Sequence, residues 1–249
     1  MKNIKVAGIG LQKTGTSSLA IALEILGFSS KHFVPEMICR SYYKEGAPQC
    51  ELIDFNLENK FQILEKYDAV TDTPVCFPEI YKKLDEQYEN IKFIYTTRNI
   101  DGWLKSVETH SHKKRYQEKF KKRLNTYKHY NPDVDLVFSC DSIGFIEYMY
   151  KVPYRKLSAQ AFKAAYISHQ NEVFDYFKSR EKDLLVIDLG KDEPWPKLCE
   201  FLGKEIPNTS FPHKGKTPSA FARYLQRKTP DAIKQRMPNR LKDNIKRYL

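Results

Sequence analysis

The spacing of apolar residues predicts that the chain begins with a strand, a glycine turn and a helix. Residues 4–11 form a short apolar run with β-branched side chains, a pattern typical of a buried strand. Leucines then recur at helical spacing through residues 16–26, and Gly27 follows directly, where a glycine commonly ends a helix. The intervening loop would therefore lie at the end of the strand.

The same alternation of strands and helices continues along the chain. Apolar runs predict strands at residues 67–74, 91–98 and 183–189, and helical spacing predicts helices at 77–88, just after Arg98, at 156–180 and at 194–203. Asn99 or Asp101 can cap the helix that follows Arg98. The alternation indicates an α/β fold in which helices flank a mainly parallel central sheet on both faces.

The chain of 249 residues is expected to form a single domain over residues 1–249. Two segments depart from the α/β pattern. Residues 107–155 are charged and aromatic, with proline breaks, and are expected to form a helical insertion. Residues 216–249 are basic and are expected to form a helical C-terminal tail with pieces around Pro230 and Pro238.

The positive charge is concentrated in these two regions. The net charge is +11, with eight basic residues and one acidic residue in 113–128, and eleven basic and two acidic residues in 213–249. Such clusters indicate an anionic ligand, polymer or membrane surface, although a solvated helix face has the same pattern. The basic tail is compatible with peripheral membrane contact. No nucleic-acid partner is expected, and the oligomeric state is left open.

Cysteine usage and hydropathy point to a reduced, soluble protein. The five cysteines are odd in number, widely spaced and without a C-x-x-C pair, which is typical of reduced thiols in a cytoplasmic protein. No zinc-ligand spacing occurs, so no metal site is expected. No apolar run reaches about 18 residues, so no membrane-spanning helix is predicted.

The loop between the first strand and the first helix reads GLQKTGTSS over residues 10–18. Gly10 and Gly15 have the spacing of a Walker A loop, but Thr16 stands where that loop has its lysine. A glycine turn that leads into a helix presents backbone N–H groups and the positive end of the helix dipole to an anion. The candidate anion-binding residues are Gln12, Lys13, Thr14, Gly15, Thr16, Ser17 and Ser18.

Polar residues also follow two of the later strands. Asp72 lies near the end of the strand predicted at 67–74, and Arg98 ends the strand predicted at 91–98. Because ligands bind at the carboxyl ends of parallel strands, we expect the glycine loop, Asp72 and Arg98 to converge on one site. The best candidate for a magnesium-binding aspartate, Asp188, lacks a second acid beside it, so a magnesium-triphosphate site is not expected.

The glycine loop resembles the 5′-phosphosulfate loop of sulfotransferases that use 3′-phosphoadenosine 5′-phosphosulfate (PAPS). A second block, IKFIYTTRNIDGWLKS, is similar to the strand of that family that ends in an arginine and is followed eight residues later by a serine, here Arg98 and Ser106. VTDTP resembles the T-D-x-P segment of one subgroup, and residues 195–214 resemble the closing helix and turn. The resemblance covers residues 4–28, 67–106 and 183–216 and implies a P-loop-like domain.

The resemblance implies an enzyme, a metal-independent transferase that moves the sulfuryl group of PAPS to an acceptor hydroxyl and releases 3′-phosphoadenosine 5′-phosphate (PAP). It implies that Lys13 contacts the bridging oxygen of the donor and that Arg98 and Ser106 hold its 3′-phosphate. Asp72 is the first candidate for the general base, and His32, which resembles a histidine near the acceptor, is the second. A basic segment that closes over the 3′-phosphate is matched more weakly, by Lys214 and Lys216. The insertion at 107–155 would lie on the acceptor side.

Several interpretations stay open at this point. Asp72 also has the pattern of a turn-capping aspartate, and a histidine such as His32 is often a packed residue. A P-loop nucleotide kinase or NTPase and a non-enzymatic anion-binding protein are the alternative functions. The acceptor, which is a carbohydrate, a lipid or a small alcohol in these interpretations, is not specified by the sequence.

Overall fold

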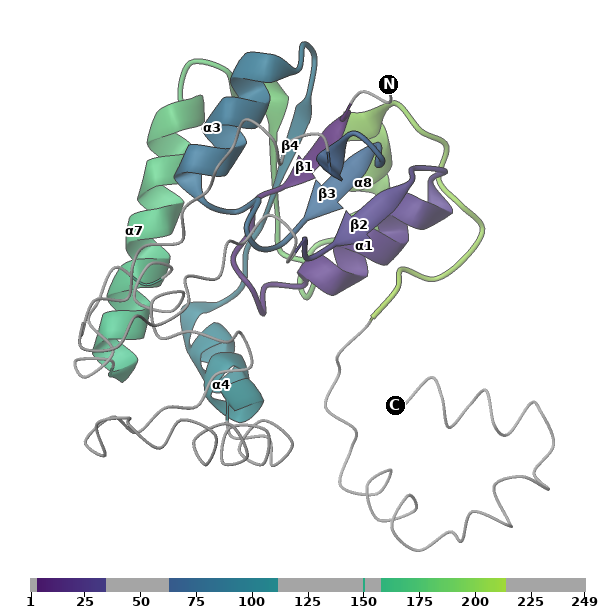
Figure 1. Ribbon diagram of the computed structural model, residues 1–249. Helices are drawn as coiled ribbons and strands as arrows, with labels where there is room; N and C mark the ends of the chain where they lie inside the picture. Colours follow the sequence, from purple (N-terminus) through teal and green to yellow (C-terminus); the bar gives the residue numbers. More distant parts are fainter. Residues whose placement is uncertain (1–3, 35–62, 112–149, 151–157, 214–249) are drawn as a thin grey trace, which may run out of the picture.

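A parallel sheet of five strands forms the centre of the molecule (Figure 1). The structure is a computed structural model that describes residues 4–34, 63–111, 150 and 158–213. The sheet has the order β2-β3-β1-β4-β5, and each pairing within it is parallel. The strands are β1 (Val6–Gly8), β2 (Ser30–His32), β3 (Ala69–Thr71), β4 (Lys92–Thr96) and β5 (Leu184–Ile187). The predicted mainly parallel α/β architecture is therefore confirmed.

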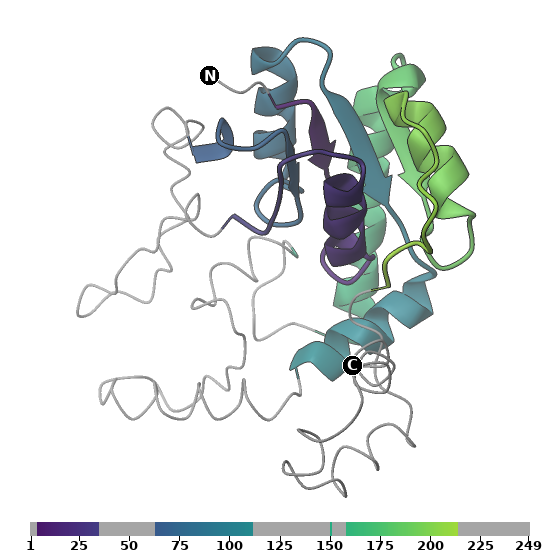
Figure 2. The ribbon, with the colours of Figure 1, turned by 90° about the vertical axis from the view of Figure 1, so that its right-hand side faces the viewer.

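Helices cover both faces of the sheet, as Figures 1 and 2 show from two directions. The described helices are α1 (Thr16–Ile25), α3 (Pro78–Gln87), α4 (Ile100–Ser111), α7 (Ala159–Phe177), α8 (Pro194–Leu202) and the short 3-10 helix η3 (Glu181–Asp183). Each lies where the apolar spacing predicted a helix, apart from η3. One strand, β2, was not predicted, because its three residues are polar and half-buried.

Alternating side chains of the strands build two apolar clusters, one on each face. Val6 and Ile94 point to the cluster formed with α1 and α8. Ala7, Phe93 and Tyr95 point to the cluster formed with α3 and α7. The central strands are thus buried on both faces, which explains why they read as continuous apolar runs rather than as alternating ones.

Side chains cap the amino ends of two helices. The Oδ1 atom of Asn99 accepts hydrogen bonds from the backbone N–H groups of Asp101 and Gly102, each at 3.2 Å, so Asn99 rather than Asp101 caps α4. The Oγ atom of Ser158 accepts from the N–H group of Ala161 at 3.1 Å and caps α7. The cap at Asn99 fixes the direction in which α4 leaves the end of β4.

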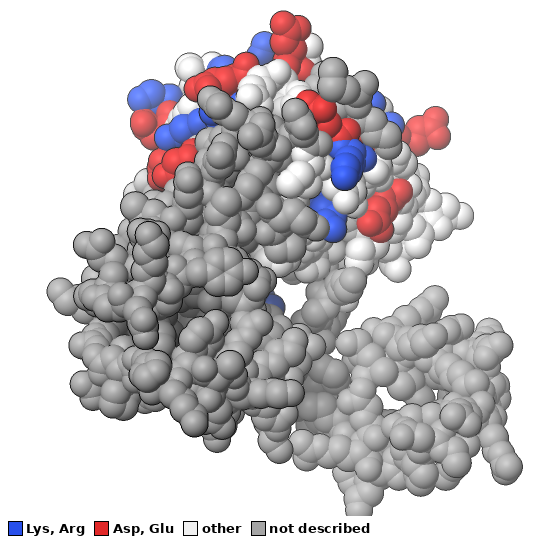
Figure 3. Space-filling model, in the orientation of Figure 1, with Lys and Arg blue, Asp and Glu red and all other residues white. Residues whose placement is uncertain are grey.

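Parts of the predicted architecture lie outside the described residues. The expected insertion at 107–155 is described only through the end of α4 and at Tyr150, which is buried against Trp103 and Phe162. The expected basic tail at 216–249 lies outside, as do the single-domain boundaries. Basic and acidic side chains are interspersed over the described surface visible in Figure 3. Within the described ranges, no helix is long and apolar enough to cross a membrane.

A charged cluster fastens α7 to α3. The Arg180 guanidinium donates to both carboxylate oxygens of Asp85, at 3.0 and 2.5 Å, and the Tyr176 hydroxyl donates to Asp85 Oδ2 at 2.7 Å. Burial by itself raises the pKa of Asp85, but the hydrogen bonds from Arg180 and Tyr176 outweigh burial and leave the pKa below its ordinary value of 3.8. The ionised carboxylate is therefore the form that holds the two helices together.

We expect Asp85→Asn to lower the free energy of unfolding by about 1–2 kcal/mol near neutral pH, because it removes charge-assisted hydrogen bonds at a partly exposed site. The pKa of Asp85 is lower in the folded state than in the unfolded state, where it is about 3.8. The contribution of Asp85 to the free energy of unfolding is therefore complete above about pH 3.8, and it is lost as the pH falls through the folded-state pKa. Urea unfolding should therefore give a lower free energy of unfolding for the variant than for the wild type at about pH 7, and this difference should become smaller towards about pH 2.

Asp175→Asn is the matched control, since the ion pair between Asp175 and Lys178 is exposed on both sides. This change should leave the free energy of unfolding close to that of the wild type. Equal effects of the two substitutions, or a pH-independent effect of Asp85→Asn, would contradict the structural role of the cluster.

Candidate active site

The site forms at the carboxyl ends of β1 and β4, two neighbouring strands whose following connections run to opposite sides of the sheet. β1 leads through α1 to β2 on one side of the sheet, whereas the adjacent β4 leads through α4 and α7 to β5 on the other side. In open α/β sheets, the crevice outside the carboxyl ends of two such strands is the usual ligand site. The glycine loop follows β1 and Arg98 follows β4, so the structure brings together the residues that were expected to converge.

The backbone of the glycine loop requires both of its glycines. A Cβ atom on Gly10 would lie 2.1 Å from the Oγ1 atom of Thr96 and 2.5 Å from its carbonyl oxygen, so only glycine can pass the end of β4 here. Gly15 has a φ of 110°, in the region that favours glycine, and immediately precedes α1. Among the described residues, no side chain caps α1, so its first turn can present N–H groups to an anion.

Thr14 fastens the loop to β4. Its hydroxyl donates to the carbonyl of Leu11 at 2.6 Å and is hydrogen bonded to the hydroxyl of Thr96 at 2.7 Å. The residue is buried, with 4% of its surface exposed. Its hydroxyl, one of the candidate anion-binding groups, is thus engaged inside the protein and positions the loop.

Gln12 connects the loop to α4 and to Tyr150. Its carbonyl accepts a hydrogen bond from the indole N–H of Trp103 at 2.9 Å, and its side-chain amide donates to the Tyr150 hydroxyl at 2.6 Å. Trp103 is fully buried, as a core tryptophan would be. The loop is therefore held from both β4 and α4.

A tyrosine of α7 holds the backbone at Arg98. The Tyr166 hydroxyl accepts from the Arg98 N–H group at 3.0 Å and donates to the Arg98 carbonyl at 2.9 Å. The same oxygen lies 2.9 Å from the Thr97 hydroxyl. Nothing in the sequence singled out Tyr166, which there is simply one apolar-face position of a long helix.

The Arg98 side chain lies between the loop and α4. It is exposed, and its Nη1 atom donates to the carbonyl of Lys13 at 3.3 Å. A Cβ atom on Gly102 would lie 3.5 Å from Arg98 Nε, so the arginine passes over the first turn of α4. Ser106 follows Gly102 by one turn and lies on the same face of that helix. Arg98 and Ser106 can therefore face one ligand.

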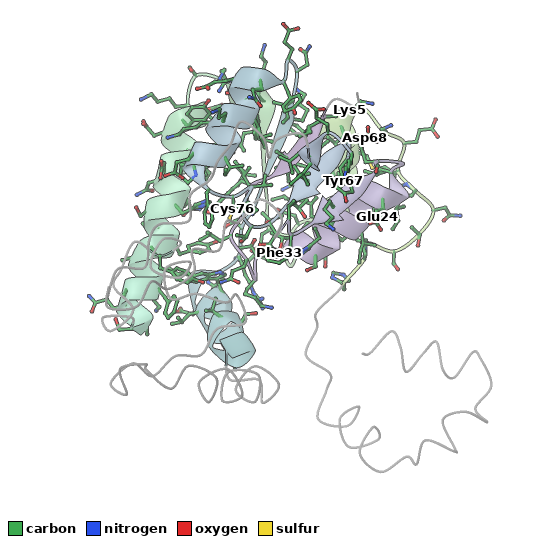
Figure 4. All side chains as sticks on the ribbon, in the orientation of Figure 1. Lys5, Glu24, Phe33, Tyr67, Asp68 and Cys76 are labelled. Carbon is green, nitrogen blue, oxygen red and sulfur yellow. The ribbon has the colours of Figure 1, made fainter. Side chains whose placement is uncertain are left out.

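Three non-glycine residues with positive φ lie near the carboxyl edge. They are Lys13 (φ 71°), Phe33 (φ 58°) and Asp72 (φ 71°), which follow β1, β2 and β3 respectively. Figure 4 labels Phe33 at this edge of the sheet. Such backbone conformations are unfavourable for residues with a side chain and gather at functional sites. His32 and Asp72 are thus both carried by strand ends whose backbone is unusual.

Asp72 and His32 form a hydrogen-bonded network with the start of α1. The Oδ2 atom of Asp72 accepts from the Thr16 hydroxyl at 2.8 Å and lies 3.2 Å from His32 Nε2. His32 Nε2 in turn lies 2.5 Å from the Ser17 hydroxyl oxygen. The sequence identified each of these four residues as a candidate but gave no indication that they touch.

The other oxygen of Asp72 is bound by its own turn. Oδ1 accepts from the N–H group of Thr73 at 2.7 Å and from the Thr73 hydroxyl at 3.0 Å. The turn-capping role considered for Asp72 therefore coexists with its contact to His32. The Asp72 side chain is 11% exposed and that of His32 is 30% exposed, so His32 is the more accessible member of the pair.

The turn that carries Asp72 is also held by α7. The N–H group of Cys76 donates to the Asp72 carbonyl at 3.1 Å, and the Cys76 carbonyl lies 2.8 Å from His169 Nε2. Because a carbonyl oxygen has no proton, Nε2 of His169 must donate this bond. Burial lowers the pKa of His169, so the neutral form is favoured and serves as a structural link.

Ser18, the last candidate of the glycine loop, lies in the first turn of α1 and is buried. Asp188 accepts from the N–H group of Gly190 at 2.9 Å and so closes its own turn. Lys214 and Lys216 lie outside the described residues. In the described part of the chain, no group of three or more histidine, cysteine, aspartate or glutamate side chains has the arrangement of a metal site.

Comparisons with known proteins cover the elements that build this site. Residues 5–220 match the family described as "Sulfotransferase domain". The chain is also 27% identical over 223 residues to "Ava biosynthesis cluster protein M" of Aspergillus versicolor, an alignment that covers 84% of this chain and 80% of that protein. The family match runs from β1 past α8 and includes the glycine loop, His32, Asp72 and Arg98. The chain therefore belongs to the sulfotransferase family.

Proposed function

We propose that the protein transfers the sulfuryl group of PAPS to a hydroxyl group of an acceptor. Membership of the sulfotransferase family supports sulfuryl transfer in general. The observation that carries the choice of donor is the contact between Arg98 and the Lys13 carbonyl at 3.3 Å. It brings a guanidinium beside an uncapped helix start, and a ligand with two separate phosphate groups suits such a pair of anion sites.

The described residues fit a donor of this kind. The first turn of α1, with Thr16 and Ser17, offers N–H groups and hydroxyls for the 5′-phosphosulfate. Arg98 offers a forked set of donors for the 3′-phosphate, and Ser106 offers a hydroxyl from the same face of α4. The donor supplies an activated sulfuryl group and leaves as PAP.

The roles of the protein groups follow from the order of the strands. Lys13, in the loop after the central strand β1, would stabilise negative charge on the oxygen between phosphate and sulfate. Arg98 lies towards β4, while Asp72 and His32 lie towards β3 and β2 on the other side of the loop. The acceptor would then approach over β3 and β2, where its hydroxyl proton can pass to the His32–Asp72 pair. The remaining rate acceleration would come from holding the donor and the acceptor in line.

The acceptor class that we favour is a small alcohol. The relative in Aspergillus versicolor carries the name of a biosynthesis cluster protein, which is more consistent with a small-molecule acceptor than with a polymer. Phe33, next to His32 at the edge of the sheet, offers an apolar contact to such a molecule. An acceptor screen with labelled PAPS tests this choice, because it can instead identify a carbohydrate or a lipid hydroxyl as the acceptor.

Isothermal titration calorimetry should show metal-independent binding of PAP. The physical reason is that the loop has no lysine after Gly15 to grip outer phosphates, and that Asp188 closes its own turn instead of facing a metal. ATP with magnesium is the comparison ligand. A clear preference for magnesium-ATP over PAP would overturn the proposal in favour of a P-loop NTPase.

Lys13→Ala and Arg98→Ala should each lower PAPS-dependent turnover, but by different routes. Lys13→Ala should reduce kcat by about 100-fold or more, because it removes charge stabilisation in the transition state. Arg98→Ala should instead weaken PAP affinity by about tenfold or more, because it removes a charge-assisted phosphate contact. Steady-state kinetics and PAP titrations separate the two effects.

Lys182→Ala is the control for these two variants. Lys182 is an exposed cation that precedes β5 at the opposite edge of the sheet, so the change removes the same charge without touching the site. Loss of turnover in Lys182→Ala comparable to that in Lys13→Ala would mean that net charge, not position, is responsible.

Asp72→Asn and His32→Gln should lower kcat by about 100-fold or more while PAP binding persists, since both remove part of the proton-accepting pair. The measurement is kcat under saturating PAPS, with PAP affinity determined in parallel. Turnover at the wild-type level in Asp72→Asn would eliminate Asp72 from proton transfer, and the same result in His32→Gln would eliminate His32.

A further inference from the structure

We propose that the hydroxyl groups of Thr16 and Ser17 couple the donor site to the His32–Asp72 pair, so that filling the donor site releases the pair from the loop. This inference rests on the proposed function and concerns the regulation of the same site. It makes Thr16 and Ser17 positioning residues for the pair, in addition to their place at the start of α1.

The hydroxyl groups that lie where the donor anion would bind are already bound to Asp72 and His32. Thr16 and Ser17 are the first two residues of α1, where an anion would sit. In the structure, however, the Thr16 hydroxyl donates to Asp72 Oδ2 at 2.8 Å, and the Ser17 hydroxyl is bound to His32 Nε2 at 2.5 Å. A hydroxyl carries one proton. The Thr16 proton cannot be donated to the donor phosphate and to Asp72 at full strength simultaneously.

The Asp72 carboxylate can keep its position when the Thr16 hydroxyl exchanges Asp72 for a bound anion. Its Oδ1 atom is held by the N–H and hydroxyl groups of Thr73, at 2.7 and 3.0 Å, independently of the loop. If Thr16 turned its hydroxyl to a bound anion, only Oδ2 would lose a hydrogen bond, and the carboxylate would stay where it is. His32 would still lie 3.2 Å from that oxygen.

The exchange makes the pair a better proton acceptor. A carboxylate that loses a hydrogen-bond donor becomes more basic, and a negative ligand nearby raises the basicity of its neighbours further. Thr16 and Ser17 of α1 and Asp72 at the end of β3 are among the groups that contact His32. Proton acceptance by the pair would therefore be strengthened when the sulfuryl donor is in place.

Nuclear magnetic resonance of protein labelled with nitrogen-15 in its histidine side chains tests this coupling. The His32 signal is assigned from its absence in His32→Gln. Saturating PAP should move the His32 Nε2 resonance in the wild type. In the double variant Thr16→Val with Ser17→Ala, the resonance of the free protein should already be displaced, and most of the response to PAP should be lost.

Further variants make the test specific. Thr16→Val removes the hydroxyl and should weaken the response of the His32 resonance to PAP. Thr16→Ser keeps the hydroxyl and should retain that response. Ser30→Ala removes a hydroxyl from β2, the strand that carries His32, but this hydroxyl has no hydrogen-bond partner among the described residues, so the response should persist.

The outcomes separate this inference from the proposed function. If calorimetry shows that PAP binds but the His32 resonance stays in place, the coupling is wrong and the proposed function stands. An equal response to PAP in the wild type and in the double variant also overturns the coupling. If the wild-type protein does not bind PAP at all, the proposed function fails and the coupling fails with it.

Discussion

The close passage of Gly10 over the end of β4 is the constraint on which the rest of the site depends. A side chain at Gly10 would collide with Thr96, so the loop can run along β4 only with a glycine at this position. That passage lets the Thr14 hydroxyl reach Thr96 and directs the chain into α1 at Gly15. The start of α1 and the end of β4 are thereby fixed side by side.

From this fixed loop, contacts extend to both sides of the sheet. Towards β4, the Lys13 carbonyl meets Arg98, whose backbone is held by Tyr166 of α7. Towards β3 and β2, Thr16 and Ser17 meet Asp72 and His32. The strand order thus separates a region suited to a nucleotide from a region suited to an acceptor, with the loop between them. This division is what supports our assignment of roles.

The sequence predicted those parts of the fold in which burial imposes a pattern. Strands β1, β3 and β4 are buried on both faces and appear as apolar runs, and α1 and α3 carry their apolar residues at helical spacing. The glycine loop was recognisable because its geometry admits few residues. By contrast, β2 is a half-buried edge strand of Ser30, Lys31 and His32, and no pattern distinguishes it from a loop.

The contacts within the site could not be predicted, because they join residues that are distant in the chain. Asp72 and His32 meet because β2 pairs with β3, which also places Thr71 opposite His32. Tyr166 reaches the Arg98 backbone only because α7 packs on the sheet next to α4. The sequence identified Asp72 and His32 as candidates and did not identify Tyr166, but in both cases the tertiary packing gives the residues their partners.

The most direct test of the account is a crystal structure of the protein with PAP bound. We expect the 5′-phosphate at the first turn of α1, against Thr16 and Ser17, and the 3′-phosphate against Arg98 and Ser106. A bisphosphate bound away from the carboxyl ends of β1 and β4, or one whose 3′-phosphate does not contact Arg98, would contradict it.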